Sequence, residues 1–413
     1  MPLDATSPAL DALLIGTALE MELSARDLQV AERRYHLIAE HLQRPTSRLR
    51  PYMDQALVYA QGSRAIGATI VDGASDDRFD LDAILEFATP FGWTPRRVLD
   101  ELCDAFQGFP DVRNIVRCTR CIQLQFAFMH LDITPMDPFR EPRQERAGNI
   151  YHSPDDKSDA RFSVNPYGFA QWFRQHVTMP HPQFADQLRQ MRSRMAVPDR
   201  IVRGTIMADA EIDRLPPPTN PLRDAPQVIA LKLMKRYLNL RYAKRDLKRP
   251  VSIYLSKVAV EVPLSSFGLC AQLESYAAEL DHRMSLALAT GQWPEERNPA
   301  FPSENFNDRW PKTNQDMKVF QADLRHLMAE LARARQSELT EIQKIFDVLF
   351  GERVTEKAVR GYLDTIPEAA TASAYERGKG YVTTPALLLP STSAAAQVSK
   401  APAHHFHTGF LRP

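Results

Sequence analysis

Acidic side chains in the first third of the chain have the types and spacing needed to transfer a nucleotidyl group. Asp80 and Asp82 lie two residues apart in a run typical of a β-strand, whose period of two places both carboxylates on one face. Asp132 stands alone in a second strand-like apolar run and could complete the site from a neighbouring strand. Two carboxylates on one face can hold one or two Mg²⁺ or Mn²⁺ ions through oxygen ligands. Two such metals would clamp the attacking hydroxyl and the leaving pyrophosphate of an in-line displacement.

A turn upstream of the acids indicates where a phosphate would lie. Gln61-Gly62-Ser63 contains a Gly-Ser pair whose backbone can approach a phosphate closely. Each stretch alone is common: Gly-Ser is most often a plain turn, Asp-x-Asp is usually solvated, and a lone Asp in a strand is often a hydrogen-bonded structural acid. The paired acids follow the turn by about twenty residues and the third acid comes about fifty residues later, an order that favours a nucleotidyltransferase site.

The elements that must position these residues form a mixed α/β first part. We expect helical structure over 7–44, with an N-cap at Ser24. We also expect a helix that begins at the N-cap Thr94 and ends near residue 106, and another that begins at the N-cap Asn165. We expect strands over 78–87, 111–118, 121–134 and 148–152, with the second and third paired, and either helix or strand over 52–60. From about residue 228 the patterns become helical, over 228–248, 252–262, 267–290, 316–350 and 355–364.

Composition sets limits on the class of protein. The chain has 413 residues, 44% of them hydrophobic and 25% charged, which is typical of a globular protein with two cores or one bilobed core. The formal net charge is zero, so we expect no strong binding to nucleic acid. No stretch of apolar residues is long enough for a membrane helix and no signal peptide is apparent, so we expect no membrane association and a cytoplasmic location. Cys118 and Cys121 form a Cys-x-x-Cys pair without a second pair, which favours two thiols in a buried strand region over a zinc site.

Basic and aromatic residues in the helical part suggest contacts with a nucleotide. Lys232, Lys235 and Arg236 fall on one helical face, and we assign Lys232 and Lys235 to a triphosphate because a nucleotide held by acids and magnesium needs a cation on its other side. The basic residues that follow, 241–249, are interpreted as a solvated charged face. Tyr254 could stack on a base or could be a core tyrosine, and the sequence leaves both open.

Taken together, these residues resemble the cGAS-like nucleotidyltransferases, which include the bacterial CD-NTase cyclic-oligonucleotide synthases of anti-phage (CBASS) operons. The Gly-Ser turn, the Asp80/Asp82 pair and Asp132 match the catalytic core of that family. The stretch 231–235 resembles its phosphate-holding helix, and Ser252 to Tyr254 resembles its base-stacking segment. Asn298-Pro299 and the stretch 304–310, which ends in Trp310, are similar to late motifs of the family, so that the resemblance spans residues 25–360.

The resemblance implies an α+β fold with two lobes and a central cleft. One is a polymerase-β-like nucleotidyltransferase lobe with a mixed sheet, the other is a C-terminal, OAS-like helical lobe, and a long N-terminal helix spans both. The expected boundaries are 1–215 for the catalytic core, 216–366 for the helical lobe and 367–413 for a flexible tail, whose composition is rich in Ala, Ser, Thr and Pro. Phe406 and Phe410 in the tail suggest docking on a partner encoded in the same defence operon.

The resemblance also implies a reaction. A template-independent enzyme would join nucleoside triphosphates, ATP or GTP or both, into a cyclic di- or oligonucleotide with release of pyrophosphate. Asp80, Asp82 and Asp132 would be the catalytic metal ligands, with Asp132 assisting deprotonation of the hydroxyl. The residues expected to bind nucleotide are Gln61, Gly62, Ser63, Lys232, Lys235, Ser252 and Tyr254. The zinc-binding insertion of the animal DNA sensors is absent, so activation by DNA is not implied, and the ending Leu411-Arg412-Pro413 leaves conjugation open.

Two other functions remain open from the sequence. A linear 2′-5′ oligonucleotide or tRNA-end nucleotidyltransferase would use the same acids, and only the topology of the product separates it from a cyclase. A non-catalytic nucleotide-binding scaffold would carry a degenerate site, and the intact acids argue against it. The bases, the linkage and the ring size lie beyond what the sequence indicates.

Overall fold

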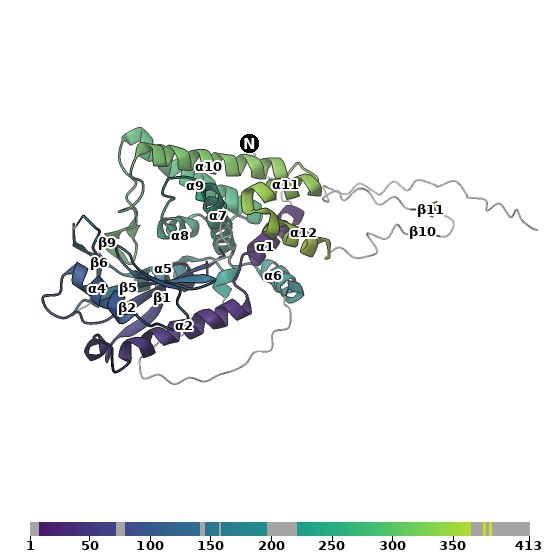
Figure 1. The fold of residues 1–413 in the computed structure, drawn as a ribbon. Coiled ribbons are helices and arrows are strands. Elements are labelled where there is room, and N and C mark those ends of the chain that lie inside the picture. The colour runs from purple at the N-terminus through teal and green to yellow at the C-terminus, as the bar shows by residue number, and fades with distance from the viewer. Residues whose placement is uncertain are drawn as a thin grey trace, which may run out of the picture.

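A computed structural model describes residues 8–71, 79–140, 145–156, 158–195 and 221–364, together with 375–376 and 380–381. Arg78, predicted to begin a strand, and the tail residues Phe406 and Phe410 lie outside these ranges. The large sheet forms one lobe together with α2 (Ala25–Gln43) and α4 (Pro95–Ala105), and most of the other helices form a second lobe beside it (Figure 1). The expected α+β fold with a mixed sheet and a helical lobe is confirmed.

A mixed sheet carries the acids. Its main path runs β1-β2-β5-β4-β3, and β6 and β7 extend it from β5. All its neighbouring pairs are antiparallel except β2 with β5, which are parallel. The strands are β1 (Leu57–Gln61), β2 (Phe79–Glu86), β3 (Asn114–Arg117), β4 (Ile122–Gln125), β5 (Met129–Pro138), β6 (Gly148–His152) and β7 (Ala160–Val164).

The alternation of β2 follows from its sequence. Leu81, Ala83 and Leu85 are buried in the core beneath the sheet, while Asp80 and Asp82 stand on the other face, as predicted. Two helices cover that core, α2 (Ala25–Gln43) and α4 (Pro95–Ala105). The predicted caps of both helices are present, because the side chains of Ser24 and Thr94 each accept a hydrogen bond from the backbone N–H three residues later.

The long N-terminal helix that the resemblance implied to span both lobes is divided into two helices. The chain forms α1 (Pro8–Glu20) and α2, separated by a break in which Met21 turns its carbonyl oxygen to the backbone N–H of Val71, 2.9 Å away. The cap at Ser24 then starts the second helix. Because α1 packs with the helical lobe and α2 with the sheet, the two lobes are joined by two helices rather than by one rigid rod (Figure 1).

Other expected elements are divided or shorter than predicted. The run 121–134 is two strands, since Phe126 and Met129 close a turn between β4 and β5. The run 316–350 is two helices with a break at 335–338, and the helix expected to reach residue 248 ends at Tyr242. The segment 52–60 becomes β1 preceded by a 3₁₀ turn, η1 (Arg50–Tyr52). The elements α6 and β7 were not predicted.

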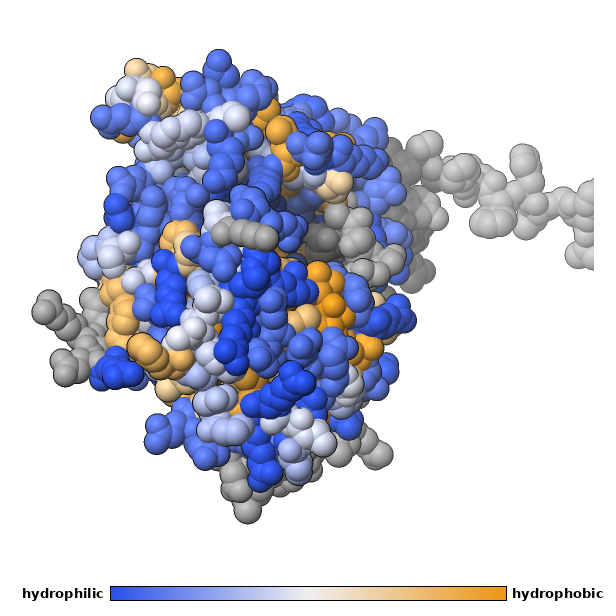
Figure 2. Space-filling view, turned by 60° about the vertical axis from the view of Figure 1, so that its left-hand side comes forward, coloured by the Kyte–Doolittle hydropathy of each residue, from blue (hydrophilic) through white to orange (hydrophobic). Residues whose placement is uncertain are grey.

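The helical lobe is built around α7, which is buried on almost every side. Residues from α1, from 65–70 and from α5 share its hydrophobic core, so the core does not divide at residue 215 along the sequence. The face of the molecule in Figure 2 is mostly hydrophilic with separate apolar patches. None of the described helices is long and apolar enough to cross a bilayer. The other helices are α3 (Gly62–Ala65), α5 (Pro166–His176), α6 (Pro182–Met195), η2 (Pro221–Asp224), α7 (Pro226–Tyr242), α8 (Ser252–Glu261), α9 (Leu269–Thr290), α10 (Asn314–Ala334), α11 (Leu339–Phe350) and α12 (Glu352–Leu363), with the short strands β8 (Arg297–Asn298), β9 (Phe301–Asn305), β10 (Tyr375–Glu376) and β11 (Gly380–Tyr381).

Candidate active site

The Gly-Ser turn lies directly against the acid strand. β1 ends at Gln61, which pairs with Asp82 of β2, and the chain then enters the short helix α3 through Gly62. Gly62 has a φ of 57°, and a Cβ atom there would lie 2.2 Å from Oδ2 of Asp82. Only glycine satisfies both conditions. Ser63 follows at the start of the turn, with its hydroxyl 3.3 Å from that of Thr69.

The register of two parallel strands brings the second and third acids together. Asp82 of β2 is the pairing partner of Asp132 of β5, and Asp80 pairs with His130. Both Asp82 and Asp132 are half-buried, whereas Asp80 is exposed. The predicted placement of the three acids on one face of adjacent strands is therefore confirmed.

Crowding of negative charge defines the electrostatics of this face. Burial, followed by the charges of Asp132 and Asp80, raises the pKa of Asp82 to about 7. Burial also raises the pKa of Asp132, against the opposing effect of a hydrogen bond that Gln123 donates to its Oδ1 over 2.9 Å. A carboxylate whose ionisation is opposed by its neighbours favours a cation between them. An oxygen-only set of this kind is also the ligand type that Mg²⁺ prefers.

The three carboxylates do not close around one point. Asp80 turns towards His130, whose Nδ1 lies 3.4 Å from its Oδ1. Within the described ranges, no three His, Cys, Asp or Glu side chains converge tightly enough to enclose one ion.

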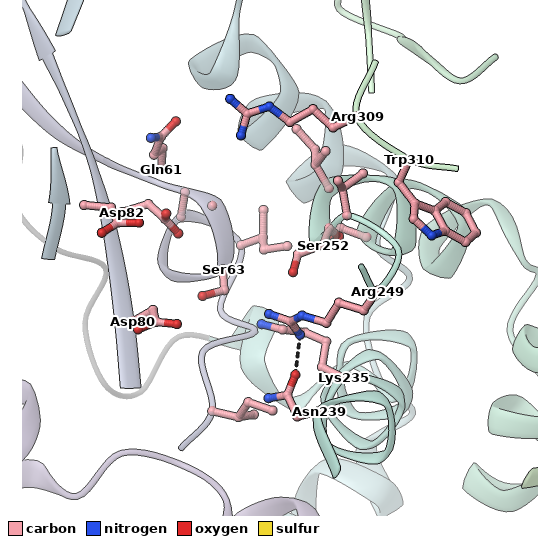
Figure 3. A pocket seen from close by; sticks show the side chains of 18 of the residues that line it. Gln61, Ser63, Asp80, Asp82, Lys235, Asn239, Arg249, Ser252, Arg309 and Trp310 are labelled. Atoms are coloured by element: carbon pink, nitrogen blue, oxygen red, sulfur yellow. Dashed lines mark hydrogen bonds between the residues drawn. The ribbon is translucent and has the colours of Figure 1, made fainter. Parts of the chain in front are cut away.

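One cavity of about 960 Å³ joins the acids to the helical lobe. All the sequence-predicted site residues line it except Lys232 and Tyr254. The acids and the Gly-Ser turn form one wall, and Lys235, Ser252 and a group of basic residues form the opposite wall (Figure 3). The lining residues that were not predicted include Asn239, Tyr242, Lys248, Arg249, Ser256 and Arg309.

Lys235 is the cation that faces the acids. It is buried on α7, donates a hydrogen bond to the carbonyl oxygen of Ala68 over 2.9 Å, and interacts with Asp82 and Asp80. Burial, followed by the nearby charge of Arg249, lowers its pKa to about 8. Arg249, held by a hydrogen bond to Asn239, extends beside it (Figure 3).

The interpretation of residues 241–249 as a solvated face holds for the exposed Lys244 and is wrong for Arg241, Arg245 and Arg249. Arg241 and Arg245 form ion pairs with the buried Asp323, at 2.8 and 2.5 Å. The helix ends at Tyr242, which allows the following residues Lys248 and Arg249 to turn back and line the cavity.

Two predicted nucleotide contacts lie away from the cavity. Lys232 is buried on the same helix as Lys235, but its ammonium group lies 2.6 Å from Glu22, which also pairs with Arg192 and Arg223. Tyr254 is fully buried and stacks on Trp310 with ring centroids 6.2 Å apart. Lys232 therefore serves an internal ion-pair network, and Tyr254 is a core residue rather than a platform for a base.

The cysteine pair lies beside the site. The backbone N–H of Cys118 donates to the carbonyl oxygen of Cys121 over 2.9 Å, so the pair closes the turn between β3 and β4. Both are free thiols, and both are half-buried rather than buried as expected. Cys121 interacts with Asp132, which places the turn at the Asp132 side of the acids.

Comparison with known proteins gives a consistent picture. Residues 16–176 match the Second Messenger Oligonucleotide or Dinucleotide Synthetase domain (SMODS). The chain is 32% identical over 410 residues to the cyclic dinucleotide synthase CdnG of Bradyrhizobium diazoefficiens, covering 97% of this chain and 94% of that protein.

Solved structures agree. The structure of the Bradyrhizobium CD-NTase CdnG in complex with GTP superimposes with a TM-score of 0.72 at 31% identity, over 86% of this chain and 99% of that one. The Escherichia coli CdnC structure with ATP gives a TM-score of 0.51 at 14% identity, over 84% and 98% of the two chains, a similarity that concerns the fold alone.

Proposed function

The chain belongs to the CD-NTase family of nucleotidyltransferases and is a homologue of cyclic dinucleotide synthases, and from this premise we propose how its cavity works. We propose that two nucleoside triphosphates bind between the lobes, one as the donor of a nucleotidyl group and the other as the acceptor. The volume of about 960 Å³ lies at the upper end of the range of about 300–1,000 Å³ for pockets that hold one small molecule. GTP is one proposed substrate, because the similar Bradyrhizobium protein was solved with it.

The proposed metal ligands are Asp80, Asp82 and Asp132. The raised pKa values of Asp82 and Asp132 support this role, because each ionised carboxylate lacks the positive charge that would balance it. Bound Mg²⁺ or Mn²⁺ would supply charge neutralisation to the attacking and leaving oxygens. Gln123 donates a hydrogen bond to Oδ1 of Asp132, which fixes the orientation of this carboxylate.

The basic wall is proposed to hold the triphosphate of the donor. Lys235 and Arg249 face the acids across the cavity (Figure 3). Ser63 lies between these two cations and the acids (Figure 3). Hydrogen bonds from cations to phosphate oxygens are charge-assisted and shorter than neutral ones. Arg249 and Lys248 come from the segment that follows α7, so binding of a triphosphate would also fix that segment against the sheet lobe.

Proton transfer is assigned to Asp132. Its carboxylate lies at the same level of the sheet as Asp82, where the attacking hydroxyl would meet the α-phosphate of the donor. A carboxyl with a raised pKa is a better base than an ordinary aspartate, so it can accept the proton of the hydroxyl as the new bond forms. A second transfer by the same residues would close the ring after the linear intermediate turns over.

The pairing of Asp82 with Asp132 beside Gly62 is the observation that carries this proposal. Incubation with all four α-labelled nucleoside triphosphates and Mg²⁺ or Mn²⁺, followed by phosphatase treatment, tests it. A cyclic product survives phosphatase because it has no terminal phosphate. A labelled product with exposed phosphates would favour the linear alternative, and absence of any product would favour the non-catalytic scaffold.

The biological setting is proposed from the family. CBASS systems use such products as second messengers in anti-phage defence, and we propose the same role here. The docking of a partner through Phe406 and Phe410 remains a proposal, because these residues lie outside the described ranges.

A further inference from the structure

One cation in the cavity has no partner that explains it. Arg309 lies between β9 and α10, half-buried, and its guanidinium extends from the helical lobe into the cavity (Figure 3). Among the described residues, no acceptor lies within hydrogen-bond distance of its Nη2, which is inaccessible to solvent, and no carboxylate forms an ion pair with it. Burying a guanidinium without a partner is costly, so the natural explanation is a partner that arrives with the substrate.

The backbone that carries Arg309 is firmly held. Asn307 accepts a hydrogen bond from the backbone N–H of Glu296 over 3.2 Å and donates one to the carbonyl oxygen of Trp310 over 3.1 Å. Phe306 and Trp310 are both buried in the helical core. The arginine is therefore presented from a fixed base, as a residue that reads a ligand must be.

The nearest acid is already committed. Asp308 forms an ion pair with Arg120 at 2.5 Å, and Arg120 also lies over the ring of Phe162, 4.4 Å from its centroid. The pKa of Arg309 is lowered overall: burial and the charge of Arg120 lower it, and these effects outweigh the opposite effect of Asp308. The charge of Arg309 consequently remains available to a ligand.

Arg309 lies at the other end of the cavity from Lys235 and Arg249 (Figure 3). Arg309 interacts with Cys121, which in turn interacts with Asp132, whereas Lys235 interacts with Asp80 and Asp82. The close view has the same arrangement, with Arg309 at one end of the cavity and Lys235 with Arg249 at the other (Figure 3). In an in-line displacement the attacking hydroxyl and the leaving pyrophosphate lie on opposite sides of the α-phosphate. If Lys235 and Arg249 hold the pyrophosphate side, the attacking nucleotide lies at Arg309.

Resting on the proposed function, we propose that Arg309 binds the O6 and N7 edge of a guanine in the attacking nucleotide. The planar fork of a guanidinium matches these two adjacent acceptors, whereas adenine presents an acceptor and a donor and its N6 amino group would oppose the arginine. A triphosphate would need several cations, but the neighbouring Arg120 is neutralised by Asp308. The cation pattern around Arg309 therefore favours a base over a triphosphate. Apolar side chains that line the same cavity, including Pro166, Phe169 and Ile253, suit the faces of a base.

The test isolates the attacking nucleotide. An α-labelled 2′,3′-dideoxynucleoside triphosphate serves only as donor, because it has no hydroxyl with which to attack, and either ddATP or ddGTP is used, whichever the protein accepts. GTP, ITP, 7-deaza-GTP and ATP are then compared as acceptors by the kcat/KM for labelled linear dinucleotide. GTP and ITP, which both carry O6 and N7, should be preferred over ATP by about five- to 150-fold, and 7-deaza-GTP, which lacks N7, should lose most of that preference.

Arg309→Met should remove the preference for GTP over ATP while the KM of the donor stays unchanged. Arg309→Lys, which keeps the charge and loses the fork, should recover only a small part of it. Lys312→Met, an exposed cation three residues away, is the matched control and should leave the ratio unchanged. Since Nη2 of Arg309 has no hydrogen-bond acceptor among the described residues, Arg309→Met should also melt no lower than the wild type in the absence of nucleotide.

Each outcome bears on the proposal. An equal loss for GTP and ATP in Arg309→Met would show a phosphate contact and overturn base reading, as would a GTP/ATP ratio that does not change. Equal use of GTP and 7-deaza-GTP by the wild type would overturn it without any variant. Product formation in these cases would leave the proposed function intact, whereas absence of product from every donor and acceptor would overturn both.

Discussion

Replacement of Asp82 by Asn should stop nucleotide transfer and, without divalent metal, should stabilise the fold. The carboxyl of Asp82 lies between the turn at Gly62 and the carboxyl of Asp132. Burial and the charges of Asp132 and Asp80 raise its pKa from 3.8 to about 7. Asn preserves the shape of the side chain and removes the charge, so it relieves the repulsion and also removes the proposed metal ligand.

The magnitude follows from the pKa. A rise from 3.8 to about 7 on folding corresponds to about 4 kcal/mol of unfavourable free energy for the ionised carboxylate. Because the side chain is only half-buried, solvent reduces this value, and we expect Asp82→Asn to raise the free energy of unfolding by about 2 kcal/mol. With an unfolding entropy of about 2.1 cal/mol/K per residue over 413 residues, the melting temperature should increase by about 2 °C.

The pH dependence has a definite sign. The folded protein binds the proton of Asp82 more tightly than the unfolded chain, so the stability contributed by the protonated carboxyl is complete below about pH 4 and is lost as the pH rises towards 7. The difference in melting temperature between Asp82→Asn and the wild type should therefore be largest near pH 8. It should narrow as the pH falls to 5.

Scanning calorimetry in EDTA at both pH values measures these differences, with nucleotide incorporation in Mg²⁺ measured on the same proteins. Asp54→Asn, a change at an exposed acid in the loop before β1, is the control and should alter neither quantity. A lower melting temperature for Asp82→Asn at pH 8 would refute the account of crowded charge. Turnover near the wild-type rate would refute the catalytic role of the acid.

Three further predictions concern the remaining assignments. Lys235→Ala should weaken binding of a non-hydrolysable nucleoside triphosphate by about ten- to a hundredfold in calorimetric titration, with Lys344→Ala, an exposed lysine of α11, as control. Because the pKa of Lys235 is about 8, wild-type affinity should also fall between pH 7 and 9, and unchanged affinity in both tests would remove this lysine from the site. Lys232→Met should lower the free energy of unfolding in urea by about 1–3 kcal/mol, since Glu22 loses one of its cations. The same variant should bind nucleotide as tightly as the wild type. Weaker nucleotide binding by a variant of full stability would restore the assignment of Lys232 to a triphosphate. Truncation after residue 366 should preserve product formation and abolish any capture of a partner through Phe406 and Phe410, and loss of synthesis would place the tail within the catalytic domain.

The acids were predictable from the sequence because strands have a simple period. The alternation around Asp80 and Asp82 fixed which face they share, and the isolated Asp132 in an apolar run indicated the neighbouring strand. The order of these motifs then indicated the family. The sequence carries no comparable signal for the register between two strands, so it did not indicate that Asp80 lies opposite His130 and turns towards it.

The basic wall was predictable only in part. α7 is buried on almost all sides, so its periodicity could not separate Lys235, which reaches the cavity, from Lys232, which lies three residues earlier and reaches Glu22. Arg249 and Arg309 reach the cavity from loops, whose course depends on tertiary packing. Trp310 belonged to a recognised motif, whereas the neighbouring Arg309 carried no signal of its own.

The most direct test of the central claim is the identity of the product. The purified protein, incubated with the four labelled nucleoside triphosphates and Mg²⁺ or Mn²⁺, should release pyrophosphate and form a species that survives phosphatase and has the mass of a cyclic di- or oligonucleotide. The Asp80→Asn, Asp82→Asn double variant should form none while retaining its fold by circular dichroism. A product that phosphatase degrades would contradict cyclisation, and an equal yield from the double variant would contradict the assignment of the active site.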